Sequence, residues 1–332
     1  MKRLLKIAAC VAAFGLGPAQ GQAAEKITFS LNWLPYGLHY GIFVAEAQGY
    51  YTKAGLDVTI QRGYGSGDTV KRTTAGTADI GMADMASVIV GRSNGLKVKQ
   101  VAVVLDRSAD AIFFVKGMGI NTPKDLPGHS LGAAAGETSL NLLPVFAVNA
   151  GFDSQKIEIV NLTPPAKFPA LVSKKVASIV AFRTEEPAIM SAAQKAGVQV
   201  GRFLFSDFNV DYYSIGIIVS DETLAKRPDM VKRFVEATMH GYAFAIKNPE
   251  AAANAFAKRF RESSRDLTLA QWKITMEHMV TDRSRANGLG YIDRGKMQHT
   301  LDLIRKYQNV KEDIKVDDIY SMNYLSKVDV PK

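Results

Sequence analysis

Strand-forming and helix-forming segments alternate along this chain in two runs, and a glycine- and proline-rich break separates them. In the first run the apolar periodicity predicts strands at 27–31, 56–61, 78–82 and 98–105 and helices at 38–51, 69–74 and 84–93. Regular alternation of this kind predicts a mainly parallel sheet covered by helices, and therefore an α/β fold.

The second run repeats the pattern after the break at 117–123. Strands are expected at 130–134, 158–162, 177–182 and 214–219, with helices at 136 onward, 168–174 and 188–196, and the chain is then helical almost to its end. Two alternating runs predict two lobes joined by two crossings, near 116–120 and 211–214. We expect residues 25–117 and 213–332 to form one lobe and residues 118–212 the other.

The N-terminus has the composition of a signal peptide. Lys2, Arg3 and Lys6 precede an apolar run of small residues, and Pro18 is followed by small residues suited to cleavage near 21–25. We therefore expect residues 1–24 to be removed on export to the periplasm. A lipid on Cys10 is the alternative, although few apolar residues precede that cysteine.

Composition excludes several kinds of site. Removing the signal peptide leaves 38 basic and 32 acidic residues, a net charge of +6, and the basic residues are scattered rather than clustered, which argues against nucleic-acid binding. Cys10 is the only cysteine, so the mature chain has neither a disulfide nor a cysteine nucleophile. No histidine pair has metal-ligand spacing. We expect no catalytic residue, cofactor or metal, and a monomer.

Several short motifs carry a family resemblance through their order and spacing. They run from the first predicted strand to the C-terminal helices: Asn32-Trp33-Leu34-Pro35, Phe43-Val44-Ala45, Gly49-Tyr50-Tyr51, Gly55-Leu56-Asp57-Val58, Ala78-Asp79-Ile80-Gly81-Met82, Leu126-Pro127-Gly128, Arg227-Pro228-Asp229 and Asn248-Pro249-Glu250. The chain resembles the pyrimidine-precursor solute-binding proteins of thiamine salvage, whose wider superfamily includes receptors for sulfonates, taurine and nitrate. The resemblance covers about residues 26–304.

The resemblance implies a two-lobed periplasmic-binding-protein fold of type II with the ligand in the cleft between the lobes. It also implies a role as the binding component of an ABC importer, with a permease and its ATPase as partners. The same family contains a thiamine-pyrimidine synthase that uses a lysine, a histidine and a cysteine-rich iron-binding segment. The stretch 83–87 contains neither lysine nor histidine and the mature chain has no cysteine, so we do not expect synthase activity.

Ligand contacts are expected at the carboxyl ends of the strands, where open α/β sheets bind small molecules. In the first lobe the candidates are the aromatic residues that could stack on a ring and the polar residues beside them: Asn32, Trp33, Tyr36, His39, Ser66 and Asp84. Turn capping or core packing is the alternative for each of them.

In the second lobe the candidates open a helix or follow a strand: Glu137, Thr138, Ser139, Phe182, Arg183, Glu185 and Glu186, with Tyr212 at the second crossing. One of the two adjacent glutamates is expected to bind a ligand amino group and the other to pair with Arg183. For Tyr212, hinge structure is an equal alternative.

Several aromatic residues and carboxylates with one obvious cation favour a neutral or amino-bearing heteroaromatic solute, such as a thiamine pyrimidine precursor. A sulfonate or nitrate site would need more donors and more positive charge. The alternative is an organic anion or nitrate held by Arg183 and the helix start at Thr138, and a periplasmic enzyme is a weaker one.

Overall fold

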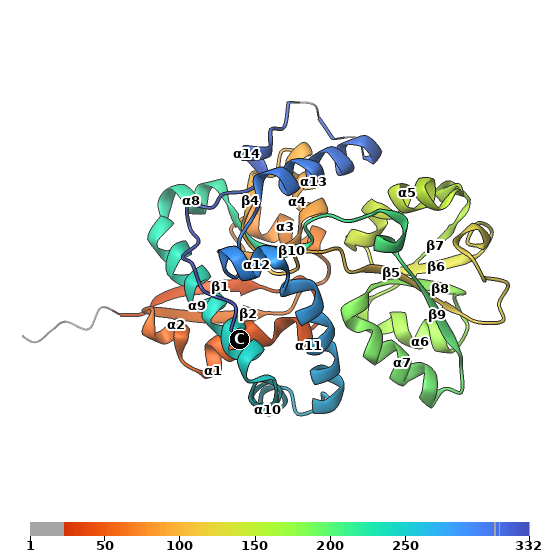
Figure 1. The fold of residues 1–332 in the computed structure, drawn as a ribbon, viewed down its shortest axis with the longest axis horizontal. Helices are drawn as coiled ribbons and strands as arrows, with labels where there is room; N and C mark the ends of the chain where they lie inside the picture. The colour runs from red at the N-terminus through yellow and green to blue at the C-terminus, as the bar shows by residue number, and fades with distance from the viewer. Residues whose placement is uncertain (1–22, 309, 312, 332) are drawn as a thin grey trace, which may run out of the picture.

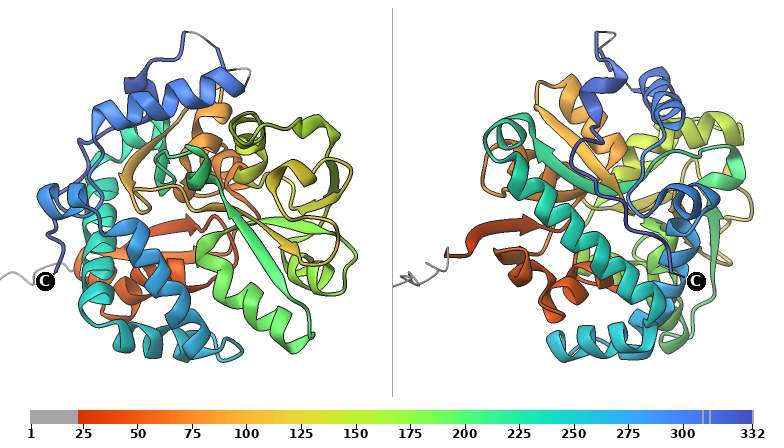
Figure 2. Two further views of the ribbon diagram at one scale, coloured as in Figure 1. Left: turned by 45° about the vertical axis from the view of Figure 1, so that its right-hand side comes forward. Right: turned by 60° about the vertical axis from the view of Figure 1, so that its left-hand side comes forward.

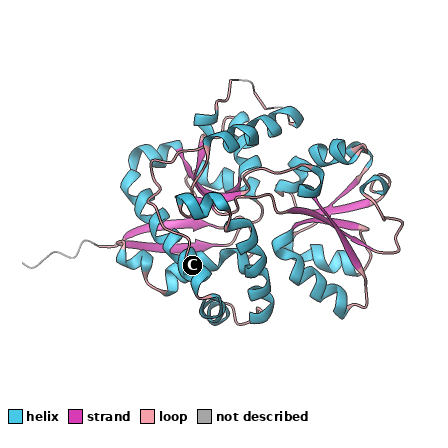
Figure 3. Cartoon of the chain, viewed as in Figure 1, coloured by secondary structure: helices cyan, strands magenta, loops and turns pink. Residues whose placement is uncertain are grey.

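The computed structural model describes residues 23–308, 310–311 and 313–331. The expectations for the signal peptide and for Cys10 concern residues that lie outside this part of the chain, apart from 23 and 24. The described chain forms two lobes side by side, each built on a five-stranded sheet flanked by helices (Figures 1 and 3). The α/β class expected from the sequence is confirmed.

The first sheet has the strand order β2-β1-β3-β10-β4. Its strands are β1 (Glu25–Ser30), β2 (Leu56–Gln61), β3 (Ile80–Asp84), β4 (Val98–Val103) and β10 (Ile215–Ser220). Strands β1, β2 and β3 pair in parallel, whereas β10 is antiparallel to both of its neighbours. Every residue of β10 is buried, as expected for a central strand covered on both faces.

Helices cover both faces of this sheet because the apolar side chains of its strands point alternately to either side. Ile217 packs in a core with Phe234, whereas its neighbour Ile218 packs in another with Ile89. The helices and short 3₁₀ turns of this lobe are η1 (Gly37–His39), α1 (Tyr40–Ala47), α2 (Tyr50–Lys53), α3 (Ser66–Thr74), α4 (Met85–Ser93), α8 (Asp221–Lys226) and α9 (Pro228–Lys247).

The second sheet has the order β7-β6-β8-β5-β9. Its strands are β5 (Asp110–Val115), β6 (Ser130–Ala133), β7 (Glu158–Asn161), β8 (Ser178–Phe182) and β9 (Val200–Leu204). Its helices and 3₁₀ turns are η2 (Pro123–Asp125), α5 (Thr138–Ala150), η3 (Ser154–Lys156), η4 (Pro164–Ala166), α6 (Lys167–Val172), η5 (Arg183–Glu185), α7 (Glu186–Lys195) and η6 (Phe205–Phe208). Figure 2 shows this lobe from two further sides.

The first crossing between the lobes differs from the expected one. Strand β5 pairs with β8 and β9 of the second sheet, so the chain crosses between Val103 and Asp110 rather than near 116–120. Gly117 and Gly119, which suggested a linker, instead have positive φ angles of 85° and 84° in the turn after β5. The second crossing runs between Leu204 and Ile215.

The two strands that follow the crossings are the antiparallel ones. The parallel strands of each sheet end at the edge that faces the other lobe, so a chain arriving from that lobe enters at this edge and runs in the opposite direction. Both β5 and β10 follow this rule. The carboxyl ends of the parallel strands in both sheets therefore face one another across the interface.

The C-terminal helices cover the first lobe and reach the second. They are α10 (Pro249–Arg259), α11 (Arg265–Met279), α12 (Asp282–Asn287), α13 (Arg294–Tyr307) and α14 (Val316–Ile319). Helix α11 packs against α7 and η5 of the second lobe, and α13 packs against α5 (Figure 1). Within the described residues, no helix combines the length and apolar character needed to cross a membrane.

Candidate ligand-binding site

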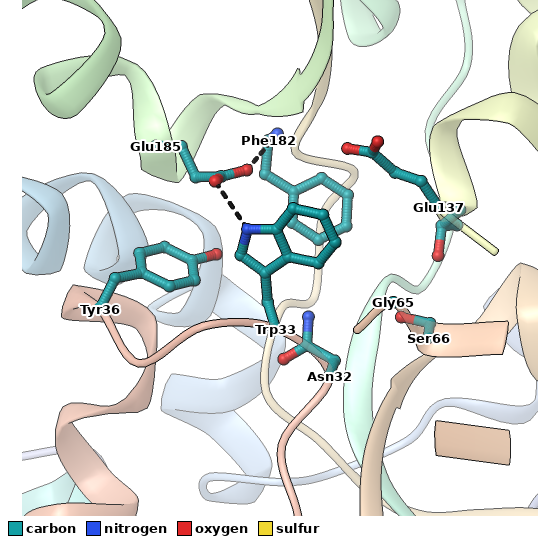
Figure 4. Close-up of a pocket in the computed structure, with 9 residues that line it drawn as sticks. Asn32, Trp33, Tyr36, Gly65, Ser66, Glu137, Phe182 and Glu185 are labelled. Carbon is teal, nitrogen blue, oxygen red and sulfur yellow. Dashed lines mark hydrogen bonds between the residues drawn. The ribbon is translucent and has the colours of Figure 1, made fainter. Parts of the chain in front are cut away.

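A cavity lies between the lobes, where the parallel strands of both sheets end (Figure 4). The loop after β1 and the start of α3 form one side, and the start of α5 and the turn after β8 form the other. The lining residues are Asn32, Trp33, Tyr36, Gly65, Ser66, Glu137, Thr138, Phe182 and Glu185. All except Gly65 were candidates from the sequence, so the structure brings these eight together at one place.

Trp33 stands at the centre of the cavity and touches both lobes. Its indole Nε1–H donates a hydrogen bond of 3.0 Å to Oε1 of Glu185 in the second lobe. The Lys167 ammonium lies over the indole ring, 4.9 Å from the ring centroid. Trp33 is only 8% exposed, so its flat face is held in a fixed place beside the cavity.

Two carboxylates and one ammonium form the charged part of the site. Glu137 forms a buried ion pair with Lys167, and its other oxygen accepts a hydrogen bond from the Ala134 N–H. Burial raises the pKa of Glu137 and of Glu185, while the nearby Lys167 ammonium opposes the rise in both. With all three groups ionised, the formal charge of the cluster is −1.

Lys167 was missed by the sequence analysis, which began the helix one residue later. The structure places it at the first residue of α6, after the prolines of η4, with its side chain wholly buried. A lysine at a helix start beyond a strand of the second lobe is the signal that could have identified it. Gly65, also missed, has φ +131°, and a Cβ there would lie 2.9 Å from the carbonyl oxygen of Gly136.

The polar residues of the first loop support one another. His39 accepts a hydrogen bond from the Tyr36 N–H at Nδ1, so its Nε2–H donates to Oδ1 of Asn32 at 3.0 Å. Burial lowers the pKa of His39 to about 3, which keeps the ring neutral. His39 lies behind Asn32 and does not line the cavity, so the expected ligand contact is corrected to a positioning role.

Asp84, Ser139 and Tyr212 also lie behind the cavity rather than in it. The Tyr212 hydroxyl contacts Asp84 at 2.9 Å and Asp110 at 2.6 Å, and Ser139 donates to Asp110 at 2.6 Å. Asp84 also caps α4 by accepting from the Ala86 N–H. These side chains are buried where the two lobes meet, beside the two crossings.

The adjacent glutamates have different surroundings. Glu185 lines the cavity, whereas Glu186 pairs with Arg202 and lies 3.9 Å from Arg183. Arg183 itself pairs with Glu277 of α11 at 2.6 Å and does not reach the cavity. The structure therefore corrects the expectation that Arg183 and Glu186 touch the ligand, because the turn η5 directs their side chains outward.

The cavity is closed around very little space. The cavity volume is about 20 Å³, which is room for one or two water molecules. Contacts between the lobes close it: the Tyr36 and Thr184 hydroxyls meet at 2.9 Å, the Gly67 N–H donates to the Gly136 carbonyl at 3.1 Å, and the Ser87 and Thr138 hydroxyls meet at 3.1 Å. In this arrangement the cavity is too small to hold a solute ring.

Comparisons with known proteins place this geometry in context. The chain is 26% identical to the riboflavin-binding protein RibY of Chloroflexus aurantiacus, covering 91% of this chain and 89% of the relative. It is 20% identical to the formylaminopyrimidine-binding protein of Halalkalibacterium halodurans, covering 90% and 91%. It is also 25% identical to a 4-amino-5-hydroxymethyl-2-methylpyrimidine phosphate synthase of Legionella pneumophila, covering 70% and 73%.

The fold is also that of a solved binding protein. The alkanesulfonate-binding protein SsuA of Xanthomonas axonopodis pv. citri superposes with a TM-score of 0.68 at 12% identity, covering 90% of this chain and 99% of that one. The expected periplasmic-binding-protein fold is therefore confirmed. The sequence model described as NMT1/THI5 like matches residues 37–252, well over half of the chain. The protein belongs to the NMT1/THI5-like family.

Proposed function

We propose that this protein is the solute-binding component of an ABC importer and that it captures a flat, nitrogen-bearing heterocycle between its lobes. The observation that carries the proposal is the pairing of Trp33 and Glu185 across the cavity, which sets an aromatic face beside a buried carboxylate. The loaded protein would deliver its solute to a permease driven by an ATPase. It does no chemistry on the solute.

The chemistry of the cavity matches such a ligand. An indole face stacks on a flat ring, and a carboxylate accepts two parallel hydrogen bonds from a ring edge that carries an amino group. When the lobes open, Oε1 of Glu185 loses its indole partner and becomes free to accept from the solute, while Oε2 still accepts from the Phe182 N–H. Asn32 adds an amide to the lining of the cavity.

The relatives support the same class of ligand. Riboflavin and formylaminopyrimidine, named in two of them, are both nitrogen heterocycles. The two-lobed fold supports capture by hinge closure. Export to the periplasm, with cleavage near 21–25, belongs to the same proposal. The synthase relatives raise the enzyme alternative, but the only cysteine of this chain is Cys10, which gives no cysteine-rich segment for iron.

An organic anion is the second candidate, and Lys167 is the observation that favours it. A buried ammonium beside the cavity would attract a sulfonate or carboxylate if it left Glu137. Two carboxylates within the same cluster oppose this, because they repel an anion.

Calorimetry with neighbouring glutamate variants tests the proposal. Glu185→Gln should weaken binding of 4-amino-5-hydroxymethyl-2-methylpyrimidine or of a flavin by tenfold or more, because a charged acceptor becomes a neutral amide. Glu186→Gln, whose carboxylate lies outside the cavity, should leave affinity within twofold. The anion candidate replaces the heterocycle if three results are found together. An alkanesulfonate binds tightly, Glu185→Gln leaves that binding unchanged, and Lys167→Met abolishes it.

A further inference from the structure

A groove adjoins the cavity on the other side of Trp33. It runs between the loop that joins β1 to η1, the prolines of η4, helix α7 and the start of α11. Trp33, Tyr36 and Glu185 line both the cavity and the groove. The groove has a volume of about 460 Å³, whereas the cavity has about 20 Å³. Most of the space beside the proposed ligand ring therefore lies in this groove.

The walls of the groove are apolar in the middle and polar at the rim. Leu34 and Pro35 of the first lobe face Pro164, Pro165 and Phe168 of the second across it. The rim carries one lysine, one glutamate and two serines, which are Lys195, Glu262, Ser263 and Ser264. With Glu185 the lining carries two carboxylates against one lysine, so the groove does not favour an anionic group.

Gln271 gives the groove a hydrogen-bond donor that no protein group uses. Its side chain is 4% exposed, and its Oε1 accepts from the Gly37 N–H at 3.2 Å, which fixes the orientation of the amide. Its Nε2 has no hydrogen-bond partner among the described residues, yet Gln271 lines the groove. This Nε2 is not among the buried atoms that lack a partner, so it is open to solvent, and a water or a ligand oxygen in the groove can accept from it.

We propose that the groove is a second subsite, which holds a hydroxylated chain attached to the ring bound at Trp33 and Glu185. The solute is then a flat nitrogen heterocycle with a neutral polar chain, and not the ring alone. The chain passes Trp33, its carbon atoms pack on the prolines and Phe168, and its hydroxyl oxygens accept from Gln271. This inference rests on the proposed function and adds the shape of the solute to it.

Riboflavin and lumiflavin share one ring system, but riboflavin carries a ribityl chain where lumiflavin carries a methyl group. A comparison of their affinities therefore tests the subsite. Calorimetry on the wild-type protein should give at least tenfold tighter binding of riboflavin. Ala188→Trp, which fills the groove from α7, should remove that difference and leave lumiflavin affinity within twofold. Gln194→Trp on the same helix, outside the groove, is the matched control and should change neither.

The possible outcomes separate the two proposals. Equal affinity of the wild type for both flavins, or an equal loss for both in Ala188→Trp, overturns the subsite and leaves the proposed function standing. Binding of the aminopyrimidine with no binding of riboflavin has the same meaning. If neither flavin nor aminopyrimidine binds, the proposed function fails and the subsite fails with it.

Discussion

At the scale of single residues, the site depends on side-chain directions that a short turn decides. Glu185 and Glu186 are neighbours of the same type, yet η5 directs the first into the cavity and leaves the second with Arg183 and Arg202. The proposed ligand class rests on which of them faces inward, because a carboxylate beside an indole favours a ring edge that carries hydrogen-bond donors.

Replacement of Trp33 tests stacking separately from hydrogen bonding. Trp33→Ala removes an aromatic pair worth about 0.5–1.5 kcal/mol beyond simple burial, so heterocycle affinity should fall at least several-fold. Trp33→Phe keeps a flat ring and should retain more of the affinity. Calorimetry on both variants measures this, and equal losses in the two would contradict a stacking role.

Lys167 and Glu137 form an ion pair, and we expect the effects of replacing them on the free energy of unfolding to be strongly coupled. Lys167→Met leaves the Glu137 carboxylate buried without its cation and should lower the free energy of unfolding by about 3–5 kcal/mol. Adding Glu137→Gln to the same chain should recover most of that loss. Urea denaturation of both variants checks the coupling, and a double variant no more stable than the single one would refute it.

Much of the site was predictable at this scale, because strand ends locate lining residues. Eight of the predicted residues line the cavity, and each lies at the end of a parallel strand or in the loop or helix start that follows one. The sequence could not show which residues near the strand ends line the cavity and which lie behind it. His39 follows a strand and Asp84 ends one, but their hydrogen bonds to Asn32 and Tyr212 hold both side chains behind the cavity wall.

At the scale of elements, a hydrogen-bond network joins β3, β5 and the second crossing. Tyr212 contacts both Asp84 and Asp110, yet a phenol has one proton, so one of the carboxyl groups must carry a proton to complete the pair of bonds. Burial, and then the neighbouring Asp110 carboxylate, raise the pKa of Asp84 to about 8. Burial raises the pKa of Asp110 as well.

This network predicts a loss of stability with rising pH. Asp84 titrates near 3.8 when unperturbed and near 8 in the fold, so the folded state binds more protons between these values and the free energy of unfolding falls as pH rises through them. Asp84→Asn mimics the protonated carboxyl. The fall in Tm from pH 5 to pH 8 should be at least about 2 °C smaller in this variant. An identical fall in wild type and variant would exclude a proton at Asp84.

The elements themselves followed from periodicity, whereas the first crossing did not. Residues 111–116 are apolar and rich in strand-forming residues, but nothing in their composition shows which sheet such a strand would join. Its partners, β8 and β9, come some 60 to 90 residues later. Only long-range pairing decides such a question, and glycines after the strand gave a misleading linker signal.

At the scale of the whole molecule, capture of a heterocycle between the lobes requires the lobes to open and close. The closed cavity is too small for a heterocycle, and cross-lobe contacts such as Tyr36 with Thr184 and Arg183 with Glu277 must break for entry. Ligand-free protein should therefore show a larger radius of gyration in solution scattering than protein saturated with its heterocycle. An unchanged radius at saturation would indicate a rigid receptor instead.

The central claim is that a flat nitrogen heterocycle is the solute of this protein, and the most direct measurement is mass spectrometry of the small molecules released when the purified exported protein is denatured. We expect a nitrogen heterocycle in wild-type protein and in Glu186→Gln, and a strongly reduced amount in Glu185→Gln. Recovery of an alkanesulfonate, taurine or nitrate with no heterocycle, in amounts that Glu185→Gln does not change, would contradict the account.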